Sequence, residues 1–402
     1  MSDFGFTIDA RLGLGRAGVI HTPHGDIATP AFIPVGTKAS VKAMLPGDVA
    51  ALGAQAVLAN AFHLYLQPGA EIVAAAGGLG AFMGWHGPTF TDSGGFQVMS
   101  LGAGFKKTIE MTIDEASPMD EDDDATAGGR TRLSRVDEDG VDFQSPLDGS
   151  QHRFTPESVM RLQHALGADI MFAFDELTTL RNTRGYQEAS VERTTRWARR
   201  CLDEHAKAPG RPQALFGVVQ GAQFEDLRRQ ACQGLVAARG PGGETFDGYG
   251  IGGALEKSLI GVIVGWCAEE LPEDKPRHLL GISEPEDMFA AVAAGADTFD
   301  CVNPSRVARN AAIYTADGRY NITNARYRSD FGPLEDGCDC LTCRNFTRAY
   351  VCHLFKAHEL LAYTLATVHN ERFTVRLVDQ MRAHLIDGTF DDFRDNWLAR
   401  WK

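Results

Sequence analysis

The chain has 402 residues, enough for one large α/β domain or for two or three smaller ones. Its hydrophobic content of 44% fits a globular core and excludes global disorder, and no run of 18 or more apolar residues predicts a membrane span. The net charge of −14 argues against a general nucleic-acid binder, because phosphate neutralisation needs a basic surface. A negative net charge is nevertheless compatible with a local basic strip.

Eight short apolar runs, each ending in polar or glycine residues, predict buried parallel strands. They are 28–35, 55–61, 88–92, 169–175, 214–220, 246–252, 277–282 and 297–302. Helix-like spacing follows several of them, at 156–166, 187–206, 224–238, 258–270 and 285–294. This alternation over residues 1–330 predicts a (β/α)₈ TIM barrel, with a doubly wound sheet as the alternative.

An acidic stretch interrupts the barrel pattern. Residues 119–139 contain five consecutive acidic residues at 120–124 and few apolar ones. We interpret about 106–131 as a flexible, solvated insertion.

Three cysteines within six residues predict a metal site. Cys338, Cys340 and Cys343 are followed by His369, and zinc takes thiolate and imidazole ligands in tetrahedral geometry. His353 and His358 lie in between as alternative fourth ligands, and Asp339 is a less favoured one. A closed Cys₃His set is typical of a structural Zn²⁺, one per chain.

The region around these cysteines forms the second part of the predicted organisation. We expect a zinc-binding subdomain at 331–375 and a C-terminal helical segment at 376–402 that packs on the barrel, with helical patterns at 358–368 and 374–385. The other five cysteines are scattered singly, which predicts free thiols in a reducing compartment such as the cytoplasm.

Carboxylates follow several of the predicted strands. Asp92, Asp175 and Asp300 lie at strand ends, and Gln220 and glycine pairs end two others. Functional groups of such barrels gather at the C-terminal strand ends. Any one Asp could instead cap the next helix, but three at corresponding ends favour a site.

These segments resemble the tRNA-guanine transglycosylases, also called queuine tRNA-ribosyltransferases, over nearly the whole chain. The resemblance rests on 91–97, 174–176, 219–221, 252–253, 281–287 and 299–309, together with the Cys₃His set. The family fold is a (β/α)₈ barrel with a zinc-binding insertion, and the match favours His369 as the fourth ligand. The family resemblance also implies a homodimer.

The resemblance implies that guanine at the anticodon wobble position of tRNA is exchanged for a 7-deazaguanine. Asp300 matches the family nucleophile, and a carboxylate suits an oxocarbenium-like centre. Asp92 matches the acid and base that protonates departing guanine. Leu177 and 254–256 depart from the common bacterial pattern, which leaves open whether the incoming base is 7-aminomethyl-7-deazaguanine or queuine.

The same resemblance implies a base pocket. Asp175 would accept the two adjacent donors of guanine, and Gln220 and the backbone N–H of Gly253 would donate to its carbonyl. Phe96 would stack on the base opposite Leu280, although a buried core aromatic is the alternative. The predicted substrate-binding set is Asp92, Ser93, Gly94, Gly95, Phe96, Asp175, Gln220 and Gly253.

Two segments match RNA-contacting parts of the family. One comprises Gly281, Ile282, Ser283, Glu284, Pro285, Glu286 and Asp287, whose acidic residues equally suit a helix N-terminus. The other comprises Ser305, Arg306, Val307, Ala308 and Arg309, for which a solvated turn with Arg–Asp pairs is the alternative. Arg326, Arg328 and Lys356 would extend the basic strip. Rival functions are a non-catalytic base- or RNA-binding paralogue, an exchange enzyme acting on DNA, and an unrelated barrel hydrolase.

Overall fold

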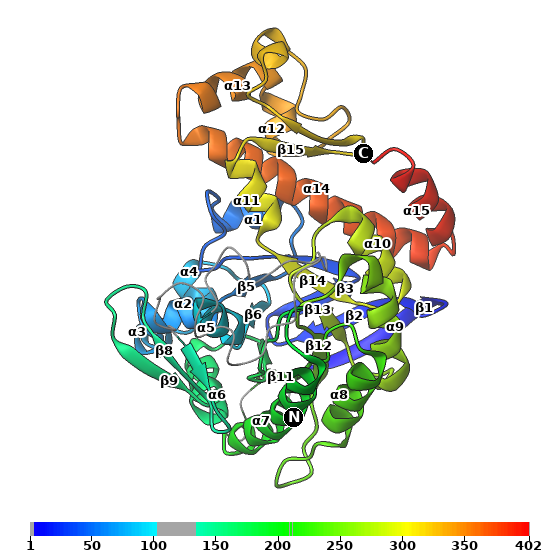
Figure 1. Ribbon diagram of the computed structural model, residues 1–402. Helices are drawn as coiled ribbons and strands as arrows, with labels where there is room; N and C mark the ends of the chain where they lie inside the picture. Colours follow the sequence, from blue (N-terminus) through cyan, green and yellow to red (C-terminus); the bar gives the residue numbers. More distant parts are fainter. Residues whose placement is uncertain (1–3, 103–133, 209, 211, 402) are drawn as a thin grey trace.

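Eight parallel strands form the centre of the fold (Figure 1). They are β4 (Ala31–Pro34), β5 (Val57–Ala59), β6 (Thr89–Thr91), β10 (Ile170–Phe172), β11 (Ala214–Val219), β12 (Gly248–Ile251), β13 (Arg277–Leu279) and β14 (Thr298–Cys301). Their order is β4-β14-β13-β12-β11-β10-β6-β5. A bridge between Val35 and Leu58 then brings the two outer strands together. All eight strands lie within the predicted runs, so the barrel is confirmed and the doubly wound alternative is wrong.

The computed structural model describes residues 4–102, 134–208, 210 and 212–401. The acidic insertion predicted at about 106–131 therefore lies outside the described residues.

Helices surround the barrel. They are α1 (Pro46–Ala51), α2 (Ala61–Leu66), α3 (Ala70–Ala75), α4 (Leu79–Met83), α5 (Gly95–Gly102), α6 (Pro156–Leu166), α7 (Arg184–Ala206), α8 (Glu225–Ala237), the 3₁₀ helix η2 (Lys257–Leu259), α9 (Ile260–Glu270) and α10 (Pro285–Ala293). Helix α6 matches its prediction because both ends are encoded locally: Thr155 and Ser158 form a capping box, and Gly167 ends it with a left-handed φ of 73°.

Three antiparallel sheets were not predicted. They are β1 (Gly5–Leu12), β2 (Gly15–Thr22) and β3 (Gly25–Thr29); β7 (Ser134–Val136), β8 (Val141–Gln144) and β9 (Gln151–Phe154); and β15 (Ala312–Thr315) with β16 (Gly318–Asn321). The first sheet closes the N-terminal end of the barrel, where Ile20 and Ile27 join the core that contains Ile170 and Phe216. The side chain of Phe4 meets the ring of Phe216 there, with centroids 6.0 Å apart.

The barrel interior is filled by side chains from neighbouring strands. Phe90, Phe172 and Phe216 are fully buried there. A Cβ at Gly248 would lie 2.4 Å from the ring of Phe216, so glycine at this position of β12 makes room for the aromatic layer. The interior is therefore a packed core that supports the site above it.

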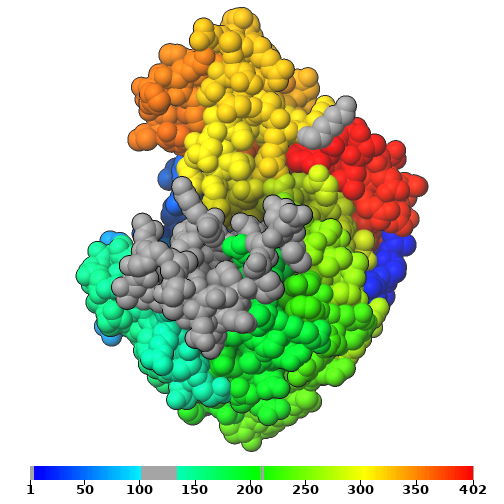
Figure 2. All heavy atoms as spheres, in the orientation of Figure 1, coloured from blue at the N-terminus to red at the C-terminus, as the bar shows by residue number. Residues whose placement is uncertain are grey.

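The C-terminal region stands out from the barrel as the yellow and orange projection in Figure 2. It contains β15, β16, the 3₁₀ helix η3 (Ala325–Ser329), α12 (Leu341–Asn345) and α13 (Arg348–Lys356). The chain enters it through α11 (Asn303–Arg309) and returns over the barrel through α14 (Leu361–Ile386) and α15 (Phe390–Leu398) (Figure 1).

Helix α14 corrects the two separate helices predicted at 358–368 and 374–385. It is one helix, and it crosses residue 375, where the zinc region was expected to end. Polar residues between the two predicted segments are buried and bind other parts of the chain. The side chain of Asn370 accepts from the backbone N–H of Tyr314 at 3.0 Å and donates to the carbonyl of Ala312 at 2.9 Å. Because tertiary contacts satisfy these groups, the helix continues through them.

Within the described ranges, none of the helices combines the length and the apolar character that a membrane span requires.

Candidate active site

The three carboxylates predicted at strand ends share the C-terminal end of the barrel. Asp92 follows β6, Asp175 follows β10, and Asp300 is the last residue but one of β14. The charge of Asp300 is close enough to raise the pKa of Asp92. None of the three caps the helix that follows its own strand; at α5 the hydroxyl of Ser93 accepts the N–H of Gly95 instead, at 3.2 Å.

Asp92 is held by the start of α2. The backbone N–H of Ala61 donates to Oδ1 at 2.8 Å, and the amide of Asn60 donates to Oδ2. Burial raises the pKa of Asp92 to about 6, and these hydrogen bonds oppose part of that rise. A carboxyl with such a pKa exchanges protons readily near neutral pH, which is what an acid and base requires.

Asp175 lies against Ser93 and Gln220. Its Oδ1 accepts from the hydroxyl of Ser93 at 3.2 Å, and its Oδ2 accepts from Gln220 Nε2 at 2.5 Å. Burial raises the pKa of Asp175 to about 6. The other amide atom, Gln220 Oε1, is buried without a hydrogen-bond partner. The two groups expected to recognise a base thus satisfy each other only in part.

Glycines surround this pair at contact distance. A Cβ at Gly253 would lie 2.5 Å from Gln220 Oε1, and a Cβ at Gly95 would lie 3.0 Å from the carbonyl oxygen of Asp175. Gly94 and Gly253 have φ values of +77° and +86°, which other residues rarely adopt. The structure therefore brings 93–95, Asp175, Gln220 and Gly253 into contact with one another.

The two apolar residues expected at the base have different surroundings. Phe96 is 39% exposed, so the alternative of a buried core aromatic is wrong. A Cβ at Gly252 would lie 3.1 Å from Leu280, which places Leu280 beside Gly252. Leu177, one of the departures from the family pattern, directs its backbone N–H to the sulfur of Met99 at 3.0 Å.

Asp300 has an asymmetric environment. Its Oδ1 accepts from the backbone N–H of Gly281 at 3.1 Å and lies 3.0 Å from His278 Nε2. Within the described residues, no hydrogen bond reaches Oδ2, and 14% of the side chain is exposed. Two contacts therefore hold Oδ1 of Asp300, and Oδ2 is left without a hydrogen bond.

A basic face lies beside Asp300. Arg306 and Arg309 lie on α11, and neither is within ion-pair distance of a carboxylate of the described residues, so the Arg–Asp alternative finds no support there. Burial lowers the pKa of Arg309, and the charge of Glu371 opposes part of that shift. Burial, then Arg309 and Lys38, lower the pKa of Lys42. Lys38 and Lys42 follow β4, which pairs with β14. We call Lys38, Lys42, Arg306 and Arg309 the basic face.

Sequence reasoning missed the two lysines of the basic face. They are separated from the arginines by more than 260 residues, and only the pairing of β4 with β14 brings the two loops together. The signal was their position directly after the first predicted strand, at the functional end of a barrel.

The 281–287 segment is only partly available. Gly281 and Glu286 are exposed, whereas Ile282, Ser283, Pro285 and Asp287 are buried at the start of α10. Glu284 pairs with Arg319 and accepts from Asn303 Nδ2 at 3.0 Å. A direct RNA contact from this segment would come from its exposed positions.

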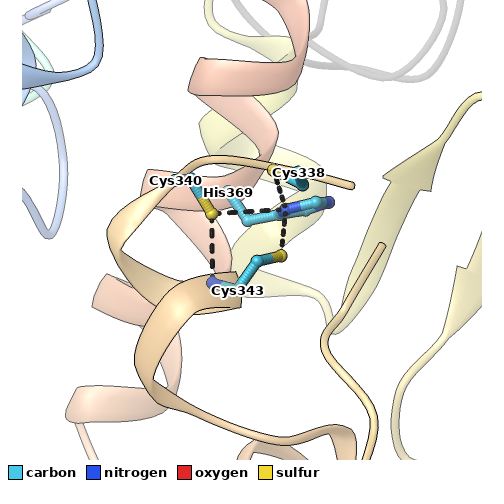
Figure 3. Close-up of side chains that lie close together, drawn as sticks. All are labelled: Cys338, Cys340, Cys343 and His369. Atoms are coloured by element: carbon cyan, nitrogen blue, oxygen red, sulfur yellow. Dashed lines mark hydrogen bonds between the residues drawn. The ribbon is translucent and has the colours of Figure 1, made fainter. Parts of the chain in front are cut away.

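The Cys₃His set meets in the C-terminal projection (Figure 3). Its four ligand atoms lie within 4.8 Å of one another. His369 Nδ1 is 3.6 Å from the sulfurs of Cys338 and Cys340 and 3.3 Å from that of Cys343. Ligands of a tetrahedral Zn²⁺ would be about 3.5 Å apart, so the set fits the ion.

Surrounding contacts orient this set and exclude the alternatives. His369 Nε2 donates to the carbonyl of Tyr314 at 2.7 Å, which leaves Nδ1 to face the sulfurs. Asp339 is engaged by Arg372 through two hydrogen bonds of 2.8 and 2.7 Å. His353 and His358 are exposed and lie outside the cluster.

Comparison with known proteins agrees with this geometry. The family described as queuine tRNA-ribosyltransferase matches residues 11–402. The chain belongs to the queuine tRNA-ribosyltransferase family. It is 44% identical to a protein of that name from Symbiobacterium thermophilum, over 96% of this chain and 88% of the relative. Relatives of the same name from Herpetosiphon aurantiacus and Gloeobacter violaceus are 43% and 44% identical, over 100% and 97% of this chain and 94% and 95% of their own lengths.

Proposed function

We propose that this protein exchanges guanine at the wobble position of tRNA for a 7-deazaguanine, as a pentosyltransferase of queuosine modification. The observation that carries the proposal is the convergence of Asp92, Asp175 and Asp300 at one barrel end. Membership of the queuine tRNA-ribosyltransferase family supports the same reaction.

Asp300 is the proposed nucleophile. Its carboxylate attacks the anomeric carbon of the ribose while the bond to guanine breaks and its electron pair passes to the base. The incoming base then displaces the carboxylate. Because each displacement inverts the anomeric carbon, the product keeps the original configuration.

Asp92 is the proposed acid and base. It protonates the departing guanine and later accepts the proton that the incoming base loses. Its pKa of about 6, raised by burial, supports both roles at neutral pH.

Asp175 and Gln220 are the proposed base readers. Their mutual hydrogen bond gives way when guanine enters: Asp175 then accepts the ring N–H and exocyclic amine, and the Gln220 amide and Gly253 N–H donate to the base carbonyl. Ser93, Gly94 and Gly95 shape the floor of the pocket, and the exposed ring of Phe96 is free to stack on the base.

The basic face and the exposed part of 281–287 are the proposed RNA footprint. Four cations without carboxylate partners among the described residues suit the phosphates of a single-stranded loop. They resolve the conflict between a chain of net charge −14 and an RNA substrate, because steering depends on the local field.

A structural Zn²⁺, one per chain, is proposed for Cys338, Cys340, Cys343 and His369. Cys340→Ser should reduce the zinc bound per chain and lower the melting temperature, since structural metal couples to folding. Cys352→Ser is the matched control, because Cys352 is a buried free thiol of the same region outside the cluster. Equal zinc content in the two variants would exclude this ligand set.

A homodimer and a cytoplasmic location complete the proposal. Large apolar side chains are exposed on the zinc-bearing projection, where Phe331 is 77% and Leu360 is 78% exposed. None of the eight cysteines forms a disulfide, which is compatible with a reducing compartment. Sedimentation of the purified protein, with Phe331→Asp as the variant expected to dissociate, tests the dimer.

The decisive experiment follows radiolabelled guanine in tRNA. We expect release of guanine that requires an incoming base and leaves a modified nucleotide at the wobble position. A hydrolase would leave an abasic ribose, and a binding paralogue would release nothing. Parallel reactions with a DNA hairpin of the same sequence test the DNA alternative, and competition between 7-aminomethyl-7-deazaguanine and queuine identifies the incoming base.

A further inference from the structure

We infer that His278 is a positioning residue that holds one oxygen of Asp300 and directs the other, Oδ2, at the ribose. The inference rests on the proposed function, in which Asp300 is the nucleophile. It assigns a role to a buried side chain of β13 that no motif singled out.

His278 lies inside the barrel, between the site and the core. Its side chain is fully buried, and its ring centroid is 5.6 Å from that of Phe90 and 5.1 Å from that of Phe172. A polar ring among aromatic neighbours is costly unless both nitrogens have partners. Both have one: Nδ1 lies 2.8 Å from the hydroxyl of Thr298, and Nε2 lies 3.0 Å from Asp300 Oδ1.

The chemistry of the partners fixes the hydrogens. A carboxylate only accepts hydrogen bonds, so His278 Nε2 carries the hydrogen that faces Asp300. In the neutral ring Nδ1 is then an acceptor, and the hydroxyl of Thr298 donates to it. The carboxylate of Asp300 therefore fixes the tautomer of His278, Thr298 satisfies the other ring nitrogen, and the anchored ring orients Asp300.

The two donors on Asp300 converge on the same oxygen. His278 and the backbone N–H of Gly281 both reach Oδ1, whereas Oδ2 receives no hydrogen bond within the described part of the chain. Attack by Oδ2 forms its bond to the anomeric carbon as the bond to guanine breaks. Oδ1 then becomes the carbonyl oxygen of the ester and keeps both hydrogen bonds. The same arrangement stabilises the carboxylate when the incoming base expels it.

Two substitutions of His278 separate positioning from packing. His278→Leu removes the donor and replaces the ring by an apolar side chain of similar size, whereas His278→Gln retains an N–H donor near the place of Nε2. We expect His278→Leu to lower kcat and the rate of covalent adduct formation on the order of 10²-fold, with KM for tRNA and for guanine nearly unchanged. His278→Gln should recover most of the loss.

Thr298→Val tests the same chain of contacts from the other side. We expect a loss of several-fold in kcat alone and no further loss when it is combined with His278→Leu, because both substitutions act through one hydrogen-bonded unit. If His278→Leu does not fold, Thr298→Val and His278→Gln still test the inference.

The outcomes distinguish the inference from the proposed function. A wild-type protein that forms no adduct and exchanges no guanine contradicts the function itself. A wild-type protein that exchanges guanine, together with His278→Leu of normal kcat, overturns the inference alone. Equal losses in His278→Leu and His278→Gln, or additive losses with Thr298→Val, would show that the ring serves packing only.

Discussion

The two ends of the barrel use the same residue type in opposite ways, and β14 shows both. Asp297 precedes the strand at its N-terminal end and is fully buried, with Arg16 donating to both oxygens at 2.8 and 2.6 Å and the N–H of Arg277 donating at 2.6 Å. Asp300, three residues later, keeps one oxygen unbound within the described structure. Both oxygens of Asp297 therefore accept hydrogen bonds, whereas only one oxygen of Asp300 does.

Strand β10 repeats this contrast. Asp169 at its N-terminal end accepts from the N–H of Thr89 at 2.8 Å and pairs with His24 at 2.6 Å. Asp175 beyond its C-terminal end is bound by Gln220 and Ser93, groups that a base can displace. On these two strands the carboxylates at the bottom bind other segments of the barrel. At the top, Asp175 is held by two side chains, and Asp300 keeps one oxygen unbound within the described residues.

Asp300→Asn should produce the largest effect on activity. Removing the nucleophilic oxygen should abolish the covalent RNA adduct and lower exchange on the order of 10⁴-fold or more, with little change in melting temperature. Adduct on denaturing gels and guanine release are the measurements. Persistence of the adduct would defeat the assignment of the nucleophile.

Asp297→Ala should show the reverse pattern. It leaves the buried guanidinium of Arg16 without its partner, which should lower the free energy of unfolding by about 3–5 kcal/mol. The kcat of the remaining folded protein should stay near that of wild type. Urea unfolding and single-turnover exchange measure the two quantities. Loss of kcat with an unchanged free energy of unfolding would contradict the assignment of a structural role to the N-terminal end of the barrel.

Asp175→Asn should uncouple base recognition from RNA binding. It removes an acceptor that guanine needs, so kcat/KM for guanine should fall much more than the affinity for tRNA. Inside the protein, the amide of Gln220 can reverse, so that its unpartnered Oε1 accepts from the new amide. Equal losses in exchange and tRNA binding would contradict the assigned role.

The same substitution should change the pH dependence of stability. Burial raises the pKa of Asp175 from 3.8 to about 6, so between these values the folded protein binds a proton that the unfolded chain has released. Stability therefore falls as pH rises through this window. Asp175→Asn should be more stable than wild type at pH 8, by roughly 3 kcal/mol, and equal to it near pH 4. Thermal unfolding at the two pH values checks the sign.

The sequence predicted the parts of this arrangement that depend on local pattern. The eight strands, the carboxylates at their ends and the Cys₃His set follow from apolar runs, residue type and short spacing. The saturation of Asp297 by Arg16 did not follow, because the partners are far apart in the chain and meet only when β2 closes the bottom of the barrel.

His278 shows why part of the site was also hidden. In the sequence it is one polar residue within a predicted buried strand. Its partners, Thr298 and Asp300, lie on the next strand, and only the register of His278 opposite Thr298 brings the three together. The continuity of helix α14 was hidden in the same way, because Asn370, which lies between the two predicted helical segments, has its hydrogen-bond partner on a distant part of the chain.

Substitutions in the basic face should have the smallest effect on tRNA binding and activity. They test whether charges on the surface of the C-terminal barrel end also serve the substrate. Lys38→Ala and Arg306→Ala should each weaken tRNA binding by about 1 kcal/mol and reduce the slope of log K against log salt by about 1. Arg199→Ala is the matched control, because Arg199 is an exposed cation on α7 without an ion pair among the described residues. Filter binding of tRNA between 50 and about 200 mM salt measures both quantities. An unchanged slope in the first two variants would remove the basic face from the footprint, and an equal change in Arg199→Ala would show that the effect of removing a positive charge is not confined to this face. Total charge is repulsive in a chain of −14, so any attraction has to come from cations that are gathered on one face.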